Sequence, residues 1–194
     1  MNTVVVPLIT AFALVFLAEL GDKTQLTTIM LSSRASASSV FTGAMLAFLV
    51  VDGVSTLVGG TLLSFLPYRW VRLGSGLVFV IFGVFSLVRK KEKIKEESQE
   101  VTFVKTFSMI SLMELGDKTQ LASIALAAEF GSPVVVLLGV MLAFAVVTGI
   151  GVILGAKLLS LLPERYLKEG ASLLFLFFGL VFIIGAVFDT PLLL

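Results

Sequence analysis

Long apolar segments separated by short polar ones dominate the chain. A membrane-spanning helix needs about 20 apolar residues, and the sequence offers six stretches of about that length or longer. They are rich in glycine and do not alternate polar and apolar residues, which favours helices over the strands of a membrane barrel. We therefore expect an all-α integral membrane protein with six transmembrane helices. They cover roughly residues 4–31, 40–66, 70–88, 103–128, 133–162 and 167–188.

The second half of the chain repeats the first. Residues 43–70 align with residues 139–166 without a gap, and about half of the aligned positions are identical. Each copy holds three spans, an odd number, so the second copy must enter the membrane from the opposite side. The sequence thus predicts two inverted three-helix repeats, an architecture that many secondary transporters use. The expected units are residues 1–88, a charged cytoplasmic linker at 89–102, and residues 103–194.

The composition agrees with a membrane protein and limits its chemistry. Hydrophobic residues make up 58% of the chain and charged residues 14%, which is too apolar for an ordinary soluble domain. Cysteine and histidine are both absent, which excludes disulfides and the usual ligands of zinc and copper. Any bound metal must therefore be held mainly by oxygen. The net charge of +1 gives no reason to expect nucleic acid as a partner, and membrane lipid is the partner that the composition implies.

Lysine and arginine predict the orientation, because positively charged loops tend to stay in the cytoplasm. One side of the six-helix arrangement carries only Arg69 and Arg72. The other side carries Arg34, Arg89, Lys90, Lys91, Lys93, Lys95, Arg165 and Lys168. We therefore place the central linker in the cytoplasm and both termini outside it. The apolar N-terminal run lacks a basic start and a cleavage site, so we expect a retained span rather than a signal peptide.

The stretch ELGDKTQL occurs twice, at residues 19–26 and again at 114–121, inside two predicted spans. Charges at the centre of a membrane cost roughly 2.5 to 3.5 kcal/mol each on insertion scales, so packing alone does not explain them. On a continuous helix, side chains three or four residues apart share a face, so each copy should form a polar stripe with its lysine beside its glutamate. Inversion would turn both stripes toward one cavity. The predicted ion ligands are Glu19, Asp22, Glu114 and Asp117, and the accessory residues are Gln25, Gln120, Lys23, Lys118, Thr24 and Thr119.

The charges of this predicted site suggest what it binds. Four carboxylates and two lysines leave a formal charge of minus two, which one divalent cation or two protons would neutralise. Oxygen ligands suit hard ions such as magnesium, calcium or manganese, and the spacing does not choose among them. Competition of the cation and protons for the same oxygens, at a site opened alternately to either side, is sufficient for antiport. The ion would be cargo, and the sequence gives no reason to expect a cofactor or an enzymatic reaction.

A further acid, Asp52, lies inside the second predicted span, where the other copy has Thr148. It is either a proton relay or outer ligand present in one half only, or a polar contact to a neighbouring helix, and the sequence leaves both open. The asymmetry matters because a perfectly symmetrical site gives no reason for the two access states to differ in energy.

Two copies of Glu-x-Gly-Asp-Lys-Thr in two three-helix halves resemble the Gdt/MneA-type cation exchangers, which are placed in a calcium/cation antiporter superfamily. The resemblance covers essentially the whole chain, and neither motif departs from the family pattern. It implies exchange of manganese, and in some members calcium, for protons, commonly as export from the bacterial cytoplasm. The short linker and the lack of a targeting extension resemble prokaryotic members, which implies a prokaryotic plasma membrane. The resemblance carries over Glu19, Asp22, Glu114 and Asp117 as the two acidic pairs, each followed by its lysine and threonine.

Several alternatives remain open. A six-span exporter of a small organic solute, such as an amino acid, would need a site for an organic group, whereas the polar residues here form compact acidic stripes. An intramembrane aspartyl protease needs two aspartates that share a proton, and the Glu and Lys beside each Asp argue against it. A non-transporting assembly factor would tolerate Glu→Gln changes. The sequence also does not decide manganese against calcium, proton against sodium, or monomer against homodimer.

Overall fold

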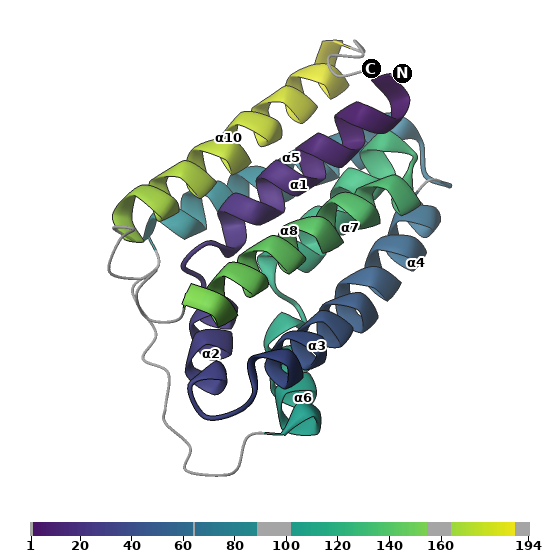
Figure 1. Ribbon diagram of the computed structural model, residues 1–194. Helices are drawn as coiled ribbons and strands as arrows, with labels where there is room; N and C mark the ends of the chain where they lie inside the picture. Colours follow the sequence, from purple (N-terminus) through teal and green to yellow (C-terminus); the bar gives the residue numbers. More distant parts are fainter. Residues whose placement is uncertain (1, 64, 89–101, 155–163, 189–194) are drawn as a thin grey trace.

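The computed structural model describes residues 2–63, 65–88, 102–154 and 164–188, and every regular element in these ranges is helical. Figure 1 shows an elongated bundle in which the helices of the two halves interleave. The expected all-helical fold is confirmed for the described ranges. Nearly all of the predicted charged linker lies outside them.

Each copy of ELGDKTQL lies at a break between two helices. α1 (Asn2–Glu19) ends at the glutamate of the first copy, and α2 (Lys23–Ser32) begins at its lysine. α6 (Phe103–Glu114) and α7 (Lys118–Phe130) repeat the same pattern in the second half. α1 and α2 are bent by 69° with respect to each other. The prediction of one continuous helix through each motif was therefore wrong.

The second span of each repeat crosses the bundle without such a bend. In the first half, α3 (Ala37–Phe48), the π-helical turn η1 (Leu49–Gly53) and α4 (Val54–Leu63) follow one another as a single span of 27 residues. In the second half, α8 (Pro133–Leu154) is helical as far as the structure describes it, and the rest of the span predicted to residue 162 lies outside the described residues. π-turns inside α-helices frequently occur at functional sites.

The third spans of the two repeats pack closely on each other. α5 (Tyr68–Val88) and α10 (Glu164–Phe188) form the most extensive helix pair among the described residues. Glycines allow this approach, since a Cβ built on Gly179 would lie 2.9 Å from the carbonyl oxygen of Gly76. Real Cβ atoms do not come so close, so the two backbones touch where only glycine fits.

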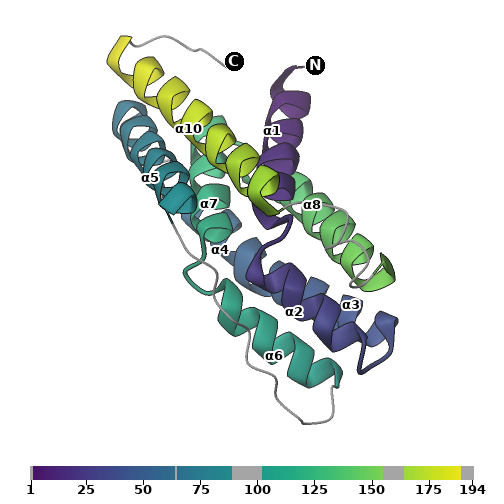
Figure 2. The ribbon, with the colours of Figure 1, turned by 90° about the vertical axis from the view of Figure 1, so that its left-hand side faces the viewer.

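Residues at matching positions of the two copies contact each other in the core. The rings of Phe48 and Phe144 stack with their centroids 3.8 Å apart, and those of Phe79 and Phe175 lie 5.6 Å apart. The helix contacts are reciprocal as well, because α1 packs on α8 and the matching α6 packs on α3. Figure 2 shows α1, α5, α7 and α10 together in one part of the bundle, and α2, α3 and α6 in the other.

Four segments are long and apolar enough to cross a membrane, namely Ala37–Leu63, Tyr68–Phe85, Pro133–Ile153 and Glu169–Phe188. The bent pair of α1 and α2 adds a fifth if it is counted as one span. α6 and α7 are not among these candidates, so length and composition give fewer spans in the described residues than the six predicted. These features describe a multi-pass membrane protein.

Candidate ion-binding site

A glycine in the left-handed region breaks the helix in each motif. Gly21 and Gly116 both have a φ of +77°, which L side chains rarely adopt. In both copies the aspartate N–H then donates to the glutamate carbonyl oxygen, at 3.1 and 3.0 Å. The turn itself therefore requires glycine at these two positions.

The two glutamines hold these turns in place. Gln25 Oε1 accepts a hydrogen bond from the Gly21 N–H at 2.5 Å, and Gln120 Oε1 accepts one from the Gly116 N–H at 2.7 Å. The amide of Gln120 also donates to Ser55 Oγ at 2.6 Å, which joins the second motif to α4. These amide oxygens thus already have a structural role, and ligation of an ion by them stays a prediction.

Replacing Gly116 by Ala should destabilise the protein by about 1–2 kcal/mol, because the backbone there is left-handed. A Cβ at this position meets nothing within 4 Å, so the expected loss comes from the backbone alone. Gly74→Ala in α5 is the matched control, since its Cβ also meets nothing and the change should be neutral or stabilise by about 0.5–1 kcal/mol. Thermal unfolding in detergent measures both variants, and an unchanged midpoint for Gly116→Ala would contradict the expectation.

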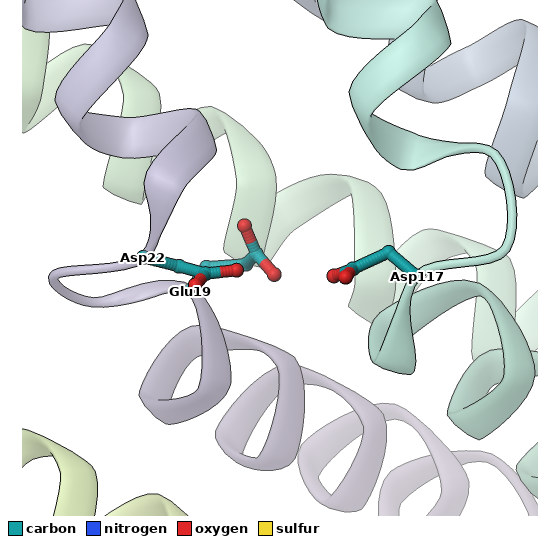
Figure 3. A group of neighbouring side chains, drawn as sticks. All are labelled: Glu19, Asp22 and Asp117. Carbon is teal, nitrogen blue, oxygen red and sulfur yellow. The ribbon is translucent and has the colours of Figure 1, made fainter. Parts of the chain in front are cut away.

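The acids converge through these turns rather than along a helical stripe. Asp22 and Asp117 occupy the N-cap positions of α2 and α7, yet neither side chain makes a capping hydrogen bond. Figure 3 shows both carboxylates turned toward the carboxylate of Glu19. One oxygen from each of the three lies within 4.8 Å of the others. Glu19 is 2% exposed and Asp117 8%, so this is a largely buried group of three acids drawn from both copies.

The fourth predicted ligand, Glu114, does not belong to this group. It is fully buried, and its Oε1 accepts a hydrogen bond from Thr24 Oγ1 of the other copy at 2.7 Å. Oγ1 of the matching Thr119 lies 3.5 Å from Glu114 Oε2 and 3.5 Å from Asp117 Oδ2. Glu19 lacks an equivalent bond, because its Oε1 is buried without a hydrogen-bond partner among the described residues. The two glutamates therefore occupy different environments.

The lysines pair across the two copies. Lys118 Nζ lies 2.6 Å from Asp22 Oδ2, and Lys23 Nζ lies 3.7 Å from Asp117 Oδ1. We expected each lysine to pair with the glutamate four residues earlier, but the turn removes that helical neighbour relation. Both observed pairs join the first motif to the second, so the site is electrostatically shared by the two halves.

Asp52 lies in the π-helical turn and is fully buried. Neither of its carboxylate oxygens has a hydrogen-bond partner among the described residues. The next helix, α4, is hydrogen-bonded to α7, because Thr56 Oγ1 donates to Ser123 Oγ at 2.8 Å. Ser55 is joined to it as well, through Gln120. Asp52 is thus placed beside the second copy, while Thr148 at the matching position carries no charge.

One buried charged cluster was missed by sequence reasoning. Arg72 was counted only for the orientation of the chain, yet it is 4% exposed and its Nε lies 2.7 Å from Glu129 Oε1. Tyr68 Oη also contacts this carboxylate, at 3.1 Å. Glu129 directly follows a predicted span, and an acid and an arginine at the ends of two spans were the available signal.

Comparison with known proteins identifies the family. The model of the family described as divalent cation/proton antiporter GDT1 matches residues 7–94 and 102–190. Protein PAM71, chloroplastic, of Arabidopsis thaliana is 30% identical over 88% of this chain, which spans 55% of that relative. GDT1-like protein 5 of Oryza sativa subsp. japonica is 27% identical, over 88% of this chain and 91% of its own length.

A yeast relative carries the same description as the family. The divalent cation/proton antiporter GDT1 of Saccharomyces cerevisiae is 23% identical, over 90% of this chain and 82% of its own length. No solved structure matches the chain. The two stretches that the family model covers each contain one copy of the motif and together include most of the sequence. The chain therefore belongs to the divalent cation/proton antiporter family GDT1.

Proposed function

We propose that this chain is a secondary transporter that exchanges a divalent cation for protons and exports the cation from the cytoplasm. Manganese is the first candidate and calcium the second. The observation that carries the proposal is the convergence of Glu19, Asp22 and Asp117, from both copies of the motif, within 4.8 Å. Three carboxylates with little exposure to water suit a hard divalent ion and would otherwise repel one another.

The proposed architecture is six spans in two inverted repeats. α6 and α7 repeat the broken geometry of α1 and α2, which supports counting them as the sixth span. In Figure 1, α1 begins at one end of the bundle and α6 at the other, as inversion requires. Reciprocal contacts between matching residues, such as Phe48 and Phe144, further support a two-fold relation.

In the proposed cycle, the cation and the protons occupy the same carboxylates in turn. Bound cation would be held by Glu19, Asp22 and Asp117, while the two lysines stay paired with the aspartates across the copies. Protons arriving from one side would neutralise the acids and release the cation. Because both lysines and all four motif acids lie at the junction of the repeats, a rocking motion of one half against the other would open this site to either side.

Flux measurements on purified protein in proteoliposomes test this function. A gradient of Mn²⁺ across the membrane should drive proton movement in the opposite direction, and Ca²⁺ in place of Mn²⁺ ranks the two ions. Sodium in place of protons tests the other counter-ion. Proton flux that does not respond to either cation would contradict the proposal, and uptake of a radiolabelled amino acid would favour a solute exporter instead.

The membrane and the orientation belong to the same proposal. We propose the plasma membrane of a prokaryote, on the resemblance of the short linker to that of prokaryotic family members. The distribution of lysine and arginine supports placing the linker at 89–102 in the cytoplasm. The relatives compared above come from plants and yeast, and one is named as chloroplastic. Labelling of single cysteines introduced on each face of the cysteine-free chain in intact cells tests the orientation.

Asp52 is the proposed proton relay, because it is a buried carboxylate outside the group of three acids. Asp52→Asn should leave Mn²⁺ binding within about threefold while lowering Mn²⁺-driven proton flux about 100-fold, the lower end of the range for loss of a proton-transfer group. Calorimetric titration in detergent and the flux assay separate the two effects. Thr148→Val at the matching position is the control and should change neither. Equal flux in Asp52→Asn and wild type would contradict the relay.

A further inference from the structure

The cluster of Tyr68, Arg72 and Glu129 joins α5 to α7 away from the ion site. The side chains of Arg72 and Glu129 are 5% and 2% exposed, and Arg72 Nε lies 2.7 Å from Glu129 Oε1. Tyr68 Oη donates to the same oxygen at 3.1 Å, and the Arg72 guanidinium lies 4.5 Å from the centre of the tyrosine ring. A buried ion pair, a hydrogen bond and a cation–π contact thus together connect α5 to α7.

The cluster lies at one end of the bundle, which we call the Tyr68 face after the start of α5. Glu129 is next to the last residue of α7, whereas the ion-site residue Asp117 precedes its first. A rise of 1.5 Å per residue separates the two by about 18 Å. The cluster is therefore too far away to coordinate the ion and must act, if it acts in transport, through the position of α5.

The pair of α5 and α10 packs against the motif helices in an asymmetric way. α5 packs against α7, and α10 packs against α1. Within the described residues, neither α5 nor α10 forms an extended interface with α2 or α6. Figure 2 shows this arrangement, with α5 and α10 alongside α7 and α1, and with α2 and α6 apart from them. Within the described residues, the α5–α10 pair is therefore held mainly against α7 and α1 rather than against α2 and α6.

The repeat does not reproduce the cluster. When the two motifs are aligned, Arg34 of the first copy takes the position of Glu129. The alignment of residues 43–70 with 139–166, continued along the chain, places Glu164 and Lys168 at the positions of Tyr68 and Arg72. A tyrosine, an arginine and a glutamate in this arrangement thus occur once in the sequence. A contact present in one copy only distinguishes the two faces of an otherwise repeated protein.

We propose that the Arg72–Glu129 pair, supported by Tyr68, is a latch that closes the Tyr68 face. It holds the α5–α10 pair against α7 and α1, and it must separate before the ion site can open to that face. The proposal rests on the proposed function in so far as alternating access is required of a transporter. Removal of one partner would leave the other charge buried and unpaired in the state that we describe, which is strongly unfavourable, so a single neutral substitution should shift the protein toward the open state.

Distances between spin labels test the latch without measuring transport. The chain contains no cysteine, so labels can be placed on Arg69→Cys in α5 and Val134→Cys in α8, two exposed positions near the Tyr68 face. The otherwise unmodified pair should give one dominant short distance by double electron–electron resonance. Glu129→Gln and Arg72→Met should each raise the population of a longer distance by about tenfold or more. The exchanged pair, Arg72→Glu with Glu129→Arg, should restore most of the short-distance population.

A control variant at the other end of the bundle and a milder variant of the cluster complete the test of the latch. Lys105→Gln, which removes a charge from α6 toward the other end, should leave the distances unchanged. If both neutral variants fail to fold, Tyr68→Phe removes only the hydroxyl and should still raise the longer-distance population. Unchanged distances in every folded variant of the cluster would overturn the latch. A shift of distances in a protein that exchanges no cation would support the latch and reject the proposed function instead.

Discussion

Changing Asp117 to Asn should lower Mn²⁺-driven proton exchange at least about 100-fold. Asp117 is the acid that the second motif contributes to the group of three, and Asn keeps its size while removing its charge. Loss of groups that merely support metal ligands costs about 10–100-fold in affinity or activity, so loss of a ligand should reach the upper end of that range. Initial rates of internal pH change in proteoliposomes measure the effect, with protein amount checked by gel. Exchange at the wild-type rate would remove Asp117 from the site.

Glu114→Gln is the informative comparison, because the sequence and the structure give different expectations for it. A symmetrical site of four acids predicts the same loss as for Asp117→Asn. In the structure, Glu114 lies outside the group of three and accepts a hydrogen bond from Thr24. We therefore expect a smaller loss, about tenfold, since Gln can keep an oxygen facing the threonine. Equal losses in the two variants would favour the symmetrical four-acid site.

The sequence was sufficient for the family and the helical class, and it selected the residues that converge. Two identical motifs in apolar surroundings predicted that four acids converge, because charges in a membrane helix need partners or a function, and three of them, Glu19, Asp22 and Asp117, lie together. Their geometry was not predictable from helical periodicity. A single glycine at positive φ in each motif breaks the helix, and periodicity beyond that residue no longer says which side chains share a face.

Contacts between the copies were the second feature beyond the reach of the sequence. A lysine four residues after a glutamate suggests a local ion pair, whereas Lys118 and Lys23 pair with aspartates about 95 residues away. Only the packing of one repeat on the other decides between these partners. The Arg72–Glu129 pair was missed for the same reason, since its members lie at the ends of spans where charges are ordinarily solvated.

Under the proposed exchange of one divalent cation for two protons, Lys118→Met should turn an electroneutral exchange into one that moves charge. If all four motif acids and both lysines take part in the charge balance, they leave minus two, and the proposed exchange of one divalent cation for two protons moves no net charge. Lys118 is the close partner of Asp22, at 2.6 Å, and Met removes its charge while keeping an unbranched side chain. A third proton would then take the place of the lysine on Asp22. This third proton must leave Asp22 when the cation binds the same carboxylate.

The exchange of three protons for one divalent cation carries one net charge per cycle. A membrane potential of 100 mV then contributes about 2.3 kcal/mol, which corresponds to a roughly 50-fold change in the cation ratio at which net flux stops. Proteoliposomes with a valinomycin-set potassium potential measure this ratio, which should not depend on voltage for the wild type. Lys23→Met should act in the same direction but more weakly, because its pair with Asp117 is longer, at 3.7 Å. Lys105→Met is the charge control outside the site, and a voltage-independent Lys118→Met would show that the lysine does not enter the charge balance of exchange.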